Sequence, residues 1–446
     1  MLDFIGIGIG PFNLSLAALL HDRTDITGAF FERKGQFAWH EGMLLPETTL
    51  QVPFMADLVS MVEPTSPFSF LNYLKHQDRL YRFYFLEDMH IPRREYNHYC
   101  QWVATQLDSL NFDSEVLAVR AAPGGFEVEV RTAGEVKRLA CRHLVLGTGT
   151  SPTLPTCLTA LAANRPEQCL HSADFLARMG EHSSGDVVVL GSGQSAAETF
   201  RYLFARQLDE AGQPRFALNW LTRAQGFFPM EYSPLGLEHF TPAYSQYFFD
   251  LPAPRKRELL AGQGLLYKVI DFETIRAIYH DLYHRTVGGA AAHVSLSASC
   301  ELIGARLQGG RIALEFRQID QGRSFALSTD KIIAATGYRP TLPRCMAPLE
   351  GSLGTDSDGR WIIDRNYRVE HAGPGSIFVQ NAELHSHGVG APDLGLGAQR
   401  AGFIANQLLG FPAFTLQSGE GFQRFGAPDT HLPSTDVDSS AHQKRA

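Results

Sequence analysis

Two glycine-rich turns constrain the fold of this chain more than any other feature. The first contains Gly8, Gly10 and Pro11, and it lies between an apolar strand and an apolar helix over residues 14–20. The second follows the valine-rich run 186–190 and reads Gly191-Ser192-Gly193-Gln194-Ser195. At such a turn the missing side chains let the backbone approach a pyrophosphate, whose charge the helix N-terminus stabilises. Two copies, each between a strand and a helix, predict an α/β protein with two Rossmann-like dinucleotide-binding domains.

The composition excludes several classes of protein. With 446 residues, 44% hydrophobic and 19% charged, the chain is expected to form a soluble protein of two or three domains. Its formal net charge of −8, without a lysine- or arginine-rich run, argues against a nucleic-acid partner. No apolar run is long enough to span a membrane, and the first strand begins too early for a signal peptide, so we expect a cytoplasmic location. The six cysteines form no Cys-x-x-Cys pair, which excludes a redox dithiol and a cysteine zinc site, and we predict no metal site.

Each glycine-rich turn is followed by a helix and then by a further strand. The residue at the end of that strand indicates which nucleotide binds at the turn. Glu32 ends the strand expected over 26–32, about twenty residues after the first turn, where a carboxylate can accept hydrogen bonds from a ribose. The strand expected over 216–221 is followed by Arg223, with no carboxylate at its end. Arginine pairs with a 2′-phosphate, which a carboxylate would repel. We therefore expect FAD at the first turn and NADPH at the second; plain surface charges at Glu32 and Arg223 are the alternatives.

The order of apolar runs predicts that the second nucleotide-binding domain is inserted into the first. Within the second domain we expect a helix near 274–283 and a meander of short strands over 294–327, and a C-terminal helix near 394–409 closes the first. The expected segments are a FAD-binding domain over 1–162, an NADPH-binding domain over 163–330, a return to the FAD-binding domain with the substrate region over 331–416, and a polar, flexible tail over 417–446.

The segment 37–99 is rich in aromatic residues and prolines and is too irregular for one regular element. It is also too apolar for a linker. Such a stretch suits the wall of a flavin pocket, and ordinary core packing is the alternative.

A family resemblance covers residues 2–410. It rests on Gly8-x-Gly10-Pro11-x-Asn13-Leu14, Phe37-x-Trp39-His40-x-Gly42-Met43, the run 64–74, Gly191 to Ala196, Ala335-Thr336-Gly337-Tyr338 and His387-Gly388. Together these stretches resemble the flavin-dependent N-hydroxylating monooxygenases of siderophore biosynthesis, the ornithine and lysine N-hydroxylases. The resemblance implies the flavin monooxygenase fold with FAD, NADPH and O2 as reactants, and a homotetramer. It also implies that Asn13 belongs to the FAD motif and that Trp39, His40 and Gln51 line the flavin.

In the family that the chain resembles, a C4a-hydroperoxide of the reduced flavin transfers oxygen to an uncharged primary amine. The cofactor carries the difficult step, so we assign no catalytic side chain. An alkyl ammonium with a pKa near ~10.4 must first lose its proton, and an apolar pocket favours the neutral form. For His40, a structural hydrogen bond and proton transfer both remain open.

Three positions depart from the family pattern where the amino-acid end of the substrate binds. Ala56 stands where the amino-acid hydroxylases carry a lysine for the carboxylate, and Leu237 and Leu266 stand where ornithine enzymes carry asparagines. A carboxylate buried without partners would cost several kcal/mol. We therefore hypothesise a substrate without a carboxylate, an aliphatic diamine such as putrescine or cadaverine. For its far ammonium, Asp393 is the first candidate acceptor and Glu238 the second; a helix N-cap is the alternative for Asp393.

Three rival functions remain. The chain could be an L-lysine N6- or L-ornithine N5-monooxygenase that grips its substrate differently, a flavin monooxygenase of ketones or sulfides, or a redox sensor without turnover. A sensor has no need for the aromatic flavin wall. The sequence does not set the diamine length, because one methylene is worth only about 1–3 kcal/mol in a pocket.

Overall fold

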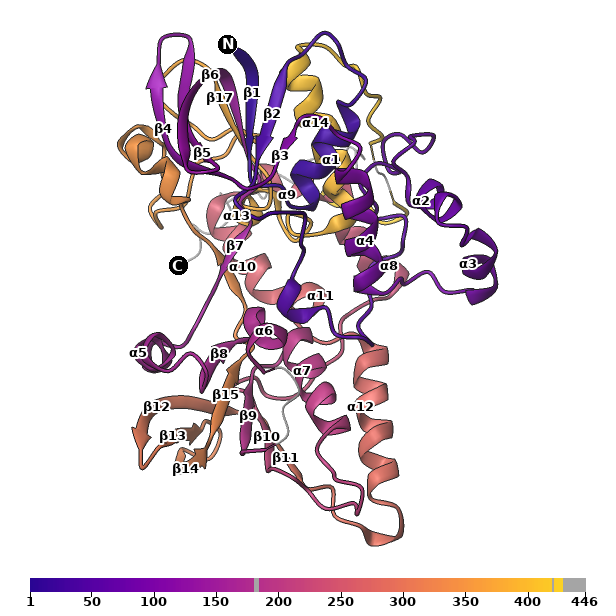
Figure 1. Cartoon of the computed structure of the whole chain (residues 1–446), viewed down its shortest axis with the longest axis vertical. Helices are drawn as coiled ribbons and strands as arrows, with labels where there is room; N and C mark the ends of the chain where they lie inside the picture. Colours follow the sequence, from indigo (N-terminus) through magenta and orange to yellow (C-terminus); the bar gives the residue numbers. More distant parts are fainter. Residues whose placement is uncertain (180–183, 419–420, 428–446) are drawn as a thin grey trace, which may run out of the picture.

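The computed structural model describes residues 1–179, 184–418 and 421–427. Two α/β domains lie at opposite ends of the molecule, and short helices of the segment 234–267 lie between them (Figure 1). Each domain is built on a sheet with a parallel core, which confirms the fold class predicted from the two glycine-rich turns. In the ranges that the structure describes, no helix is both long and apolar enough to cross a membrane.

The first sheet has a parallel part and an antiparallel part that share one long strand, β6. The parallel part has the order β3–β2–β1–β6–β17, and β5 and β4 continue the sheet antiparallel to β6. The strands are β1 (Leu2–Ile7), β2 (Gly28–Phe31), β3 (Leu110–Asn111), β4 (Ser114–Ala122), β5 (Gly125–Thr132), β6 (Glu135–Leu146) and β17 (Ser376–Val379). The carboxyl ends of the parallel strands therefore meet at one edge, where ligands bind in such sheets.

Helices α1 (Pro11–Leu19), α4 (Arg93–Ala104) and α14 (Gly397–Leu409) pack together beside this sheet (Figure 1). Pro11 suits the first position of α1, because its missing N–H would have no partner inside the helix. Leu14 and Leu16 of α1 and Ile404 of α14 are buried in one core. The predicted first and last helices are thus both present, with bounds close to those expected.

The aromatic segment 37–99 forms a short turn of helix, η1 (Glu41–Met43), and the helices α2 (Phe70–His76) and α3 (Leu80–Leu86), and it runs into the start of α4. Most of its rings pack on one another: the Phe70 ring lies 5.5 Å from both the Tyr73 and the Tyr99 rings. For these residues the alternative of ordinary core packing is confirmed.

The second sheet has five parallel strands in the order β11–β10–β9–β15–β8. They are β8 (Cys169–His171), β9 (Val187–Leu190), β10 (Leu218–Leu221), β11 (Val294–Ser297) and β15 (Lys331–Ala334). The helices of this domain are α5 (Thr156–Asn164), α6 (Phe175–Met179), α7 (Gln194–Ala205) and α12 (Phe272–Arg285). A separate antiparallel meander contains β12 (Cys300–Gln308), β13 (Arg311–Gln318) and β14 (Arg323–Thr329).

The structure corrects the expected domain boundaries. The strand 331–334, which we assigned to the return into the first domain, pairs with β9 and β8 and completes the second sheet. The second domain also begins before residue 163, because Leu158 of α5 is buried with Cys169 and Val188. Each of the two sheets contains a strand with the same pattern, an apolar run followed by small residues. The sequence alone therefore could not show to which sheet the strand 331–334 belongs. Likewise β11 extends the parallel sheet and does not belong to the meander.

The chain crosses between the two domains in two strands that lie next to each other. β7 (Thr150–Pro152) leads into the second domain, β16 (Tyr338–Pro340) leads back, and the two pair antiparallel. The second domain also contains the short helices η2 (Ser172–Asp174) and η4 (Val287–Gly289). The elements on the first domain or between the two are α8 (Pro234–Leu237), η3 (Glu238–Phe240), α9 (Pro242–Asp250), α10 (Ala253–Gly262), α11 (Gly264–Tyr267), η5 (Arg344–Ser352), α13 (Leu384–His387) and η6 (Leu394–Leu396).

Part of the expected flexible tail is packed. The Phe425 ring lies 4.6 Å from the Tyr244 ring of α9 and 5.1 Å from the His239 ring. This apolar ring is one of the contacts that hold residues 421–427 on this surface. Residues 428–446 lie outside the described part of the chain.

A buried ion pair ties α14 to the segment before α13. The Arg400 guanidinium is 3% exposed and the Glu383 carboxylate 0% exposed, and they form a direct salt bridge. Arg400 Nη1 also donates to the Ala391 carbonyl oxygen at 2.8 Å, and the guanidinium stacks 4.3 Å over the Phe12 ring. The pair thereby links α14 to the start of α1 at Phe12 and to the loop between α13 and η6 at Ala391.

We predict that Arg400→Met lowers the free energy of unfolding by about 3–5 kcal/mol, because the Glu383 charge is left buried without its partner. The double variant Arg400→Met/Glu383→Leu removes both charges and should regain most of this loss. Urea unfolding of the purified apoprotein checks both, with Arg276→Met in the exposed pair Glu273–Arg276 as a control that should change little. A double variant no more stable than Arg400→Met would contradict this account.

Candidate cofactor and substrate site

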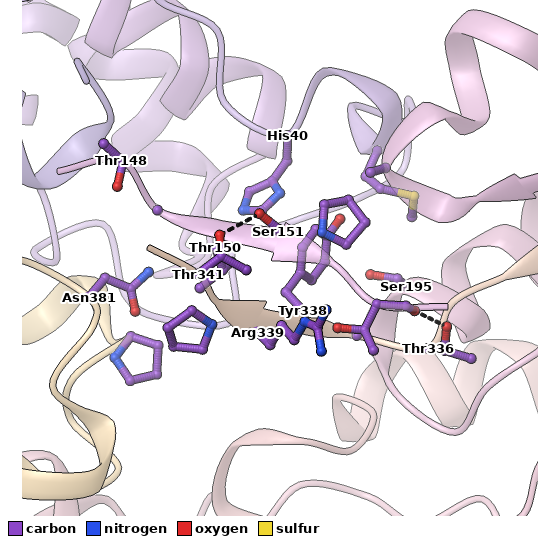
Figure 2. A pocket seen from close by; sticks show the side chains of 18 of the residues that line it. His40, Thr148, Thr150, Ser151, Ser195, Thr336, Tyr338, Arg339, Thr341 and Asn381 are labelled. Carbon is purple, nitrogen blue, oxygen red and sulfur yellow. Dashed lines mark hydrogen bonds between the residues drawn. The ribbon is translucent and has the colours of Figure 1, made fainter. Parts of the chain in front are cut away.

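A cavity of about 2360 Å³ lies between the two domains, and both glycine-rich turns open onto it. Figure 2 shows the paired strands β7 and β16 crossing it, with a hydrogen bond of 2.9 Å between the Ser151 and Thr341 hydroxyls. Thr148 lies toward the first domain and Ser195 toward the second (Figure 2). The carboxyl ends of both sheets therefore face one shared space.

The first turn requires glycine for two different reasons. Gly8 has φ +85°, and a Cβ there would lie 2.7 Å from the Gly147 carbonyl oxygen, so the turn is pressed against the end of β6. Gly10 has φ −89°, and the nearest atom to a Cβ there is 3.9 Å away. The free space beside Gly10 belongs to the cavity, where a pyrophosphate can approach the backbone.

Glu32 lines the cavity at the carboxyl end of β2, where the sequence placed it. Its Oε2 accepts a hydrogen bond from the Ile9 backbone N–H at 3.0 Å, and its Oε1 accepts one from Lys34 N–H at 3.1 Å. The carboxylate is thus oriented beside the first turn.

Asn13, in contrast, supports the turn from behind. It is fully buried and does not line the cavity. Its Nδ2 donates to the Gly8 carbonyl oxygen at 2.7 Å, and its Oδ1 accepts from Gln380 Nε2 at 2.7 Å. The motif residue therefore holds the shape of the loop and makes no direct contact with the cavity.

The second turn repeats this design. A Cβ at Gly191 would lie 2.3 Å from the Ala335 carbonyl oxygen, at the end of β15. The whole run 191–195 and Arg223 line the cavity. Gln194 also has an internal role: its Oε1 accepts from Asp271 N–H at 2.8 Å, and its Nε2 donates to Glu198 Oε1 at 2.8 Å. It ties the start of α7 to the start of α12.

A buried ion pair beneath the cavity joins the two domains, and sequence reasoning missed it. Arg93 Nη1, at the start of α4, lies 3.0 Å from Glu198 Oε2 of α7, and the two side chains are 13% and 4% exposed. Burial raises the pKa of Glu198, and the Arg93 charge opposes that rise. Nothing local in the sequence marks two charges that meet only when the domains pack.

The wall expected beside the flavin lines the cavity through Trp39, His40 and Gln51. The His40 ring lies 5.9 Å from the Tyr338 ring of β16 (Figure 2), and enclosure, with the nearby Arg93 and Lys34 charges, lowers the pKa of His40 to about 4. The imidazole is therefore neutral at physiological pH.

Gln51 Nε2 is buried and has no hydrogen-bond partner among the residues that the structure describes. Buried amide donors are almost always paired, so this group is available to a molecule in the cavity. Two open glycine turns, an oriented ribose acceptor and an unpaired donor fit a dinucleotide at each turn, with a flavin ring beside the segment 38–51.

None of the five expected substrate residues, Ala56, Leu237, Glu238, Leu266 and Asp393, lines the cavity itself. Ala56 and Leu266 are buried. Leu266 packs in an apolar cluster with Tyr244 and Phe248, and its neighbour Tyr267 reaches the cavity. The Tyr267 hydroxyl is buried and finds no hydrogen-bond partner in the described part of the chain.

The two candidate carboxylates have partners of their own. Asp393 caps η6, with its Oδ1 accepting from Gly395 N–H at 2.7 Å, which confirms the cap alternative. Burial raises its pKa to about 6. Glu238 accepts from the backbone N–H groups of Phe422 and Gln423, at 2.8 and 2.6 Å, so both of its oxygens hold the packed tail segment. The sequence could not reveal this, because the contact joins residues 184 positions apart.

A lysine side chain lies next to Tyr267. Lys268 follows Tyr267, lines the cavity, and places its ammonium 4.9 Å over the Tyr267 ring. The Lys268 backbone carbonyl oxygen would lie 3.1 Å from a Cβ atom added at Gly193, so Lys268 is also next to the second turn.

Comparison with known proteins agrees with this geometry. A model of the L-lysine 6-monooxygenase/L-ornithine 5-monooxygenase family matches residues 1–340. The chain belongs to this family. The rhizobactin siderophore biosynthesis protein RhbE of Rhizobium meliloti is 45% identical over 98% of this chain and 97% of its own length. A putrescine N-hydroxylase of Shewanella oneidensis is 39% identical over 95% of this chain and 84% of its own length.

A solved structure of the cadaverine monooxygenase DfoA from Erwinia amylovora, bound to FAD, superposes with a TM-score of 0.90 at 37% identity, covering 96% of this chain and 99% of that one. As a member of the family, the enzyme is an NADPH-dependent flavin monooxygenase that hydroxylates an amine nitrogen.

We predict that two alanine substitutions in the first turn separate folding from cofactor binding. Gly8→Ala should lower the free energy of unfolding of the apoprotein, because of its positive φ and the contact with Gly147. Gly10→Ala should leave that stability unchanged and weaken FAD binding, because its methyl group points into the space left for the pyrophosphate. Urea unfolding and FAD titration measure the two effects, and unaltered FAD affinity in Gly10→Ala would argue against a nucleotide at this turn.

Proposed function

We propose that this enzyme hydroxylates one primary amine of an aliphatic diamine, putrescine or cadaverine, in an early step of hydroxamate siderophore biosynthesis. The observation that carries the proposal is apolar side chains at Ala56, Leu237 and Leu266, where amino-acid hydroxylases provide a cation and amides. Leu266 lies in an apolar cluster, where an unpartnered carboxylate would cost several kcal/mol. The printed names of the Shewanella and Erwinia relatives, a putrescine N-hydroxylase and a cadaverine monooxygenase, support the same substrate class.

On this proposal FAD binds along the first turn. Gly8, Gly10 and Pro11 present backbone to the pyrophosphate, and Glu32 accepts hydrogen bonds from the ribose. Trp39, His40 and Gln51 lie beside the flavin ring, and the Gln51 amide donates to it. FAD held there would supply the oxygen-activating chemistry, and these side chains would position it. Desolvation lowers the pKa of His40 to about 4, which favours the neutral imidazole beside the flavin ring.

NADPH binds along the second turn, where Gly191, Ser192, Gly193 and Ser195 face the cavity and Arg223 pairs with the 2′-phosphate. Gln194 holds the turn through its bonds to Asp271 and Glu198.

The reacting amine must be uncharged to act as a nucleophile, and an apolar site disfavours its protonated form. Asp393 is the proposed acceptor for the far ammonium: its neighbours Pro392 and Leu394 line the cavity, and its carboxylate is ionised at neutral pH. Glu238 becomes available only if the tail segment 421–423 leaves it. A homotetramer and a cytoplasmic location are further parts of the proposal.

The alternative function is an L-lysine N6- or L-ornithine N5-monooxygenase. One observation favours it: Lys268 lines the cavity and places its ammonium over the Tyr267 ring. That lysine could hold a substrate carboxylate in place of the cation missing at position 56.

We predict that putrescine or cadaverine is hydroxylated with a kcat/KM at least about a hundredfold above those of L-ornithine and L-lysine, since a penalty of about 3 kcal/mol corresponds to that ratio. Hydroxylamine formation is measured with NADPH oxidation, because uncoupled oxidation consumes NADPH without product. Ala56→Lys alone should not confer ornithine use, whereas Ala56→Lys/Leu237→Asn/Leu266→Asn should.

Efficient turnover of either amino acid with inert diamines would defeat the diamine proposal. If Lys268→Met then abolished the amino-acid activity, the alternative function would be established instead.

We also predict that Arg223→Gln raises the KM for NADPH about 10- to 100-fold, because a charge-assisted hydrogen bond is worth about 1.5–3 kcal/mol. The KM for NADH, which lacks the 2′-phosphate, should stay the same. Steady-state kinetics with both nucleotides measures this. The matched control is Arg215→Gln, at an exposed arginine of the same domain outside the cavity, and an equal effect on NADPH and NADH would argue against the 2′-phosphate contact.

A further inference from the structure

Two histidines of α12 face each other on the outer surface of the second domain, and they do not line the cavity between the domains. His280 and His284 are both exposed. Their Nε2 atoms lie 3.0 Å apart, and their ring centroids are 4.1 Å apart. The two Nε2 atoms share a hydrogen bond in this structure, so the same nitrogen of each ring lies at one place on the helix surface.

The helix that carries them is firmly anchored, so the pair is preorganised. At its start, Asp271 Oδ2 accepts from Thr274 N–H at 2.9 Å, and Asp271 N–H donates to Gln194. At its end, Arg285 donates to the Phe204 carbonyl oxygen at 2.6 Å. Ile278 is buried in the domain core on the inner face. Figure 1 shows α12 as a long helix along one edge of the second domain.

The spacing of the pair suits a metal ion. Residues four apart lie on one helix face, and two histidines at this spacing bind zinc in the helix of many metalloproteases. With metal–nitrogen bonds of about 2.0–2.1 Å, ligand nitrogens are about 3.3 Å apart at a tetrahedral angle and about 2.9 Å apart at a right angle. The observed 3.0 Å falls between these two values.

We propose that His280 and His284 form a bidentate site for a divalent transition-metal ion that prefers imidazole nitrogen, such as Zn²⁺, Cu²⁺ or Ni²⁺. The two imidazoles provide two ligands, and water fills the remaining positions. The ion therefore exchanges with solvent, and the site differs from the closed four-ligand sites that hold structural zinc.

The surroundings favour binding without catalysis. Asp281, which stands where metalloproteases have their general base, is paired with Arg201 at 3.1 Å. Glu273 lies two turns before His280 and pairs with Arg276. No third histidine, cysteine or carboxylate joins the pair among the residues that the structure describes.

The site is tested by titrating Zn²⁺ into the FAD-loaded enzyme in isothermal calorimetry. One ion should bind per wild-type chain, and His280→Ala or His284→Ala should each weaken binding at least about tenfold. The matched control is His76→Ala, at an exposed histidine of α2 that contacts Trp102 and, among the described residues, no second histidine. This variant should bind Zn²⁺ like the wild type. Equal Zn²⁺ binding by wild type and the double variant His280→Ala/His284→Ala would overturn the proposal.

A second measurement identifies the ligands directly. Electron paramagnetic resonance of the Cu²⁺ complex should show coupling to two imidazole nitrogens in the wild type and to one in each single variant. The same two-nitrogen spectrum in the double variant would place the ion elsewhere. Saturating Zn²⁺ should also raise the melting temperature of the wild type and not of the double variant, because an ion that binds only the folded chain stabilises it. NADPH oxidation with a diamine should be the same in both proteins, since the pair lies outside the cavity.

Discussion

The close contact between each glycine turn and the strand end beside it is the constraint on which the rest of the structure depends. Gly8 lies against the Gly147 carbonyl at the end of β6, and Gly191 lies against the Ala335 carbonyl at the end of β15. A side chain at either position would push the turn away from its sheet. Because both turns stay close to their sheets, the amino ends of α1 and α7 and the carboxyl ends of both sheets face one cavity. In α/β sheets, ligands bind at the carboxyl ends of the parallel strands. Because this holds for both sheets, the two nucleotide sites lie opposite each other.

The side chains around this cavity influence the reaction mainly by excluding water and by holding groups in position. His40 is kept neutral by its surroundings, Gln51 keeps a free amide donor, and Leu266 adds hydrocarbon beside Tyr267. Such an environment suits an enzyme whose cofactor carries the difficult chemistry and whose substrate must be uncharged to react. The buried pair Arg93–Glu198 provides the opposite kind of interaction, two charges that compensate each other between the domains.

Much of the fold followed from local patterns in the sequence. Periodicity and turn residues predicted the first strand and helix, the second turn, α12 and the C-terminal helix, because apolar spacing and glycine positions act over a few residues. The family resemblance was confirmed. The patterns failed where two solutions look alike locally. The strand 331–334 was assigned to the wrong sheet, since a strand pattern does not say which neighbours it pairs with. The family resemblance assigned Asn13 to the FAD motif, and the structure shows that its amide bonds the Gly8 carbonyl from behind the turn.

The sequence by itself determined the class of fold, the two nucleotide motifs and the family, because these depend on residue types at fixed short spacings. The tertiary structure decided which side chains meet. It gave both Glu238 oxygens to the packed tail, Asp393 to the start of η6, and brought Lys268 beside the second turn. The cap at Asp393 is local, two residues from Gly395, whereas the Glu238 and Lys268 contacts join residues far apart in the chain and exist only once the domains and the tail have packed. A sequence pattern records what a short segment prefers, whereas a partner across the fold is set by the packing of the whole molecule.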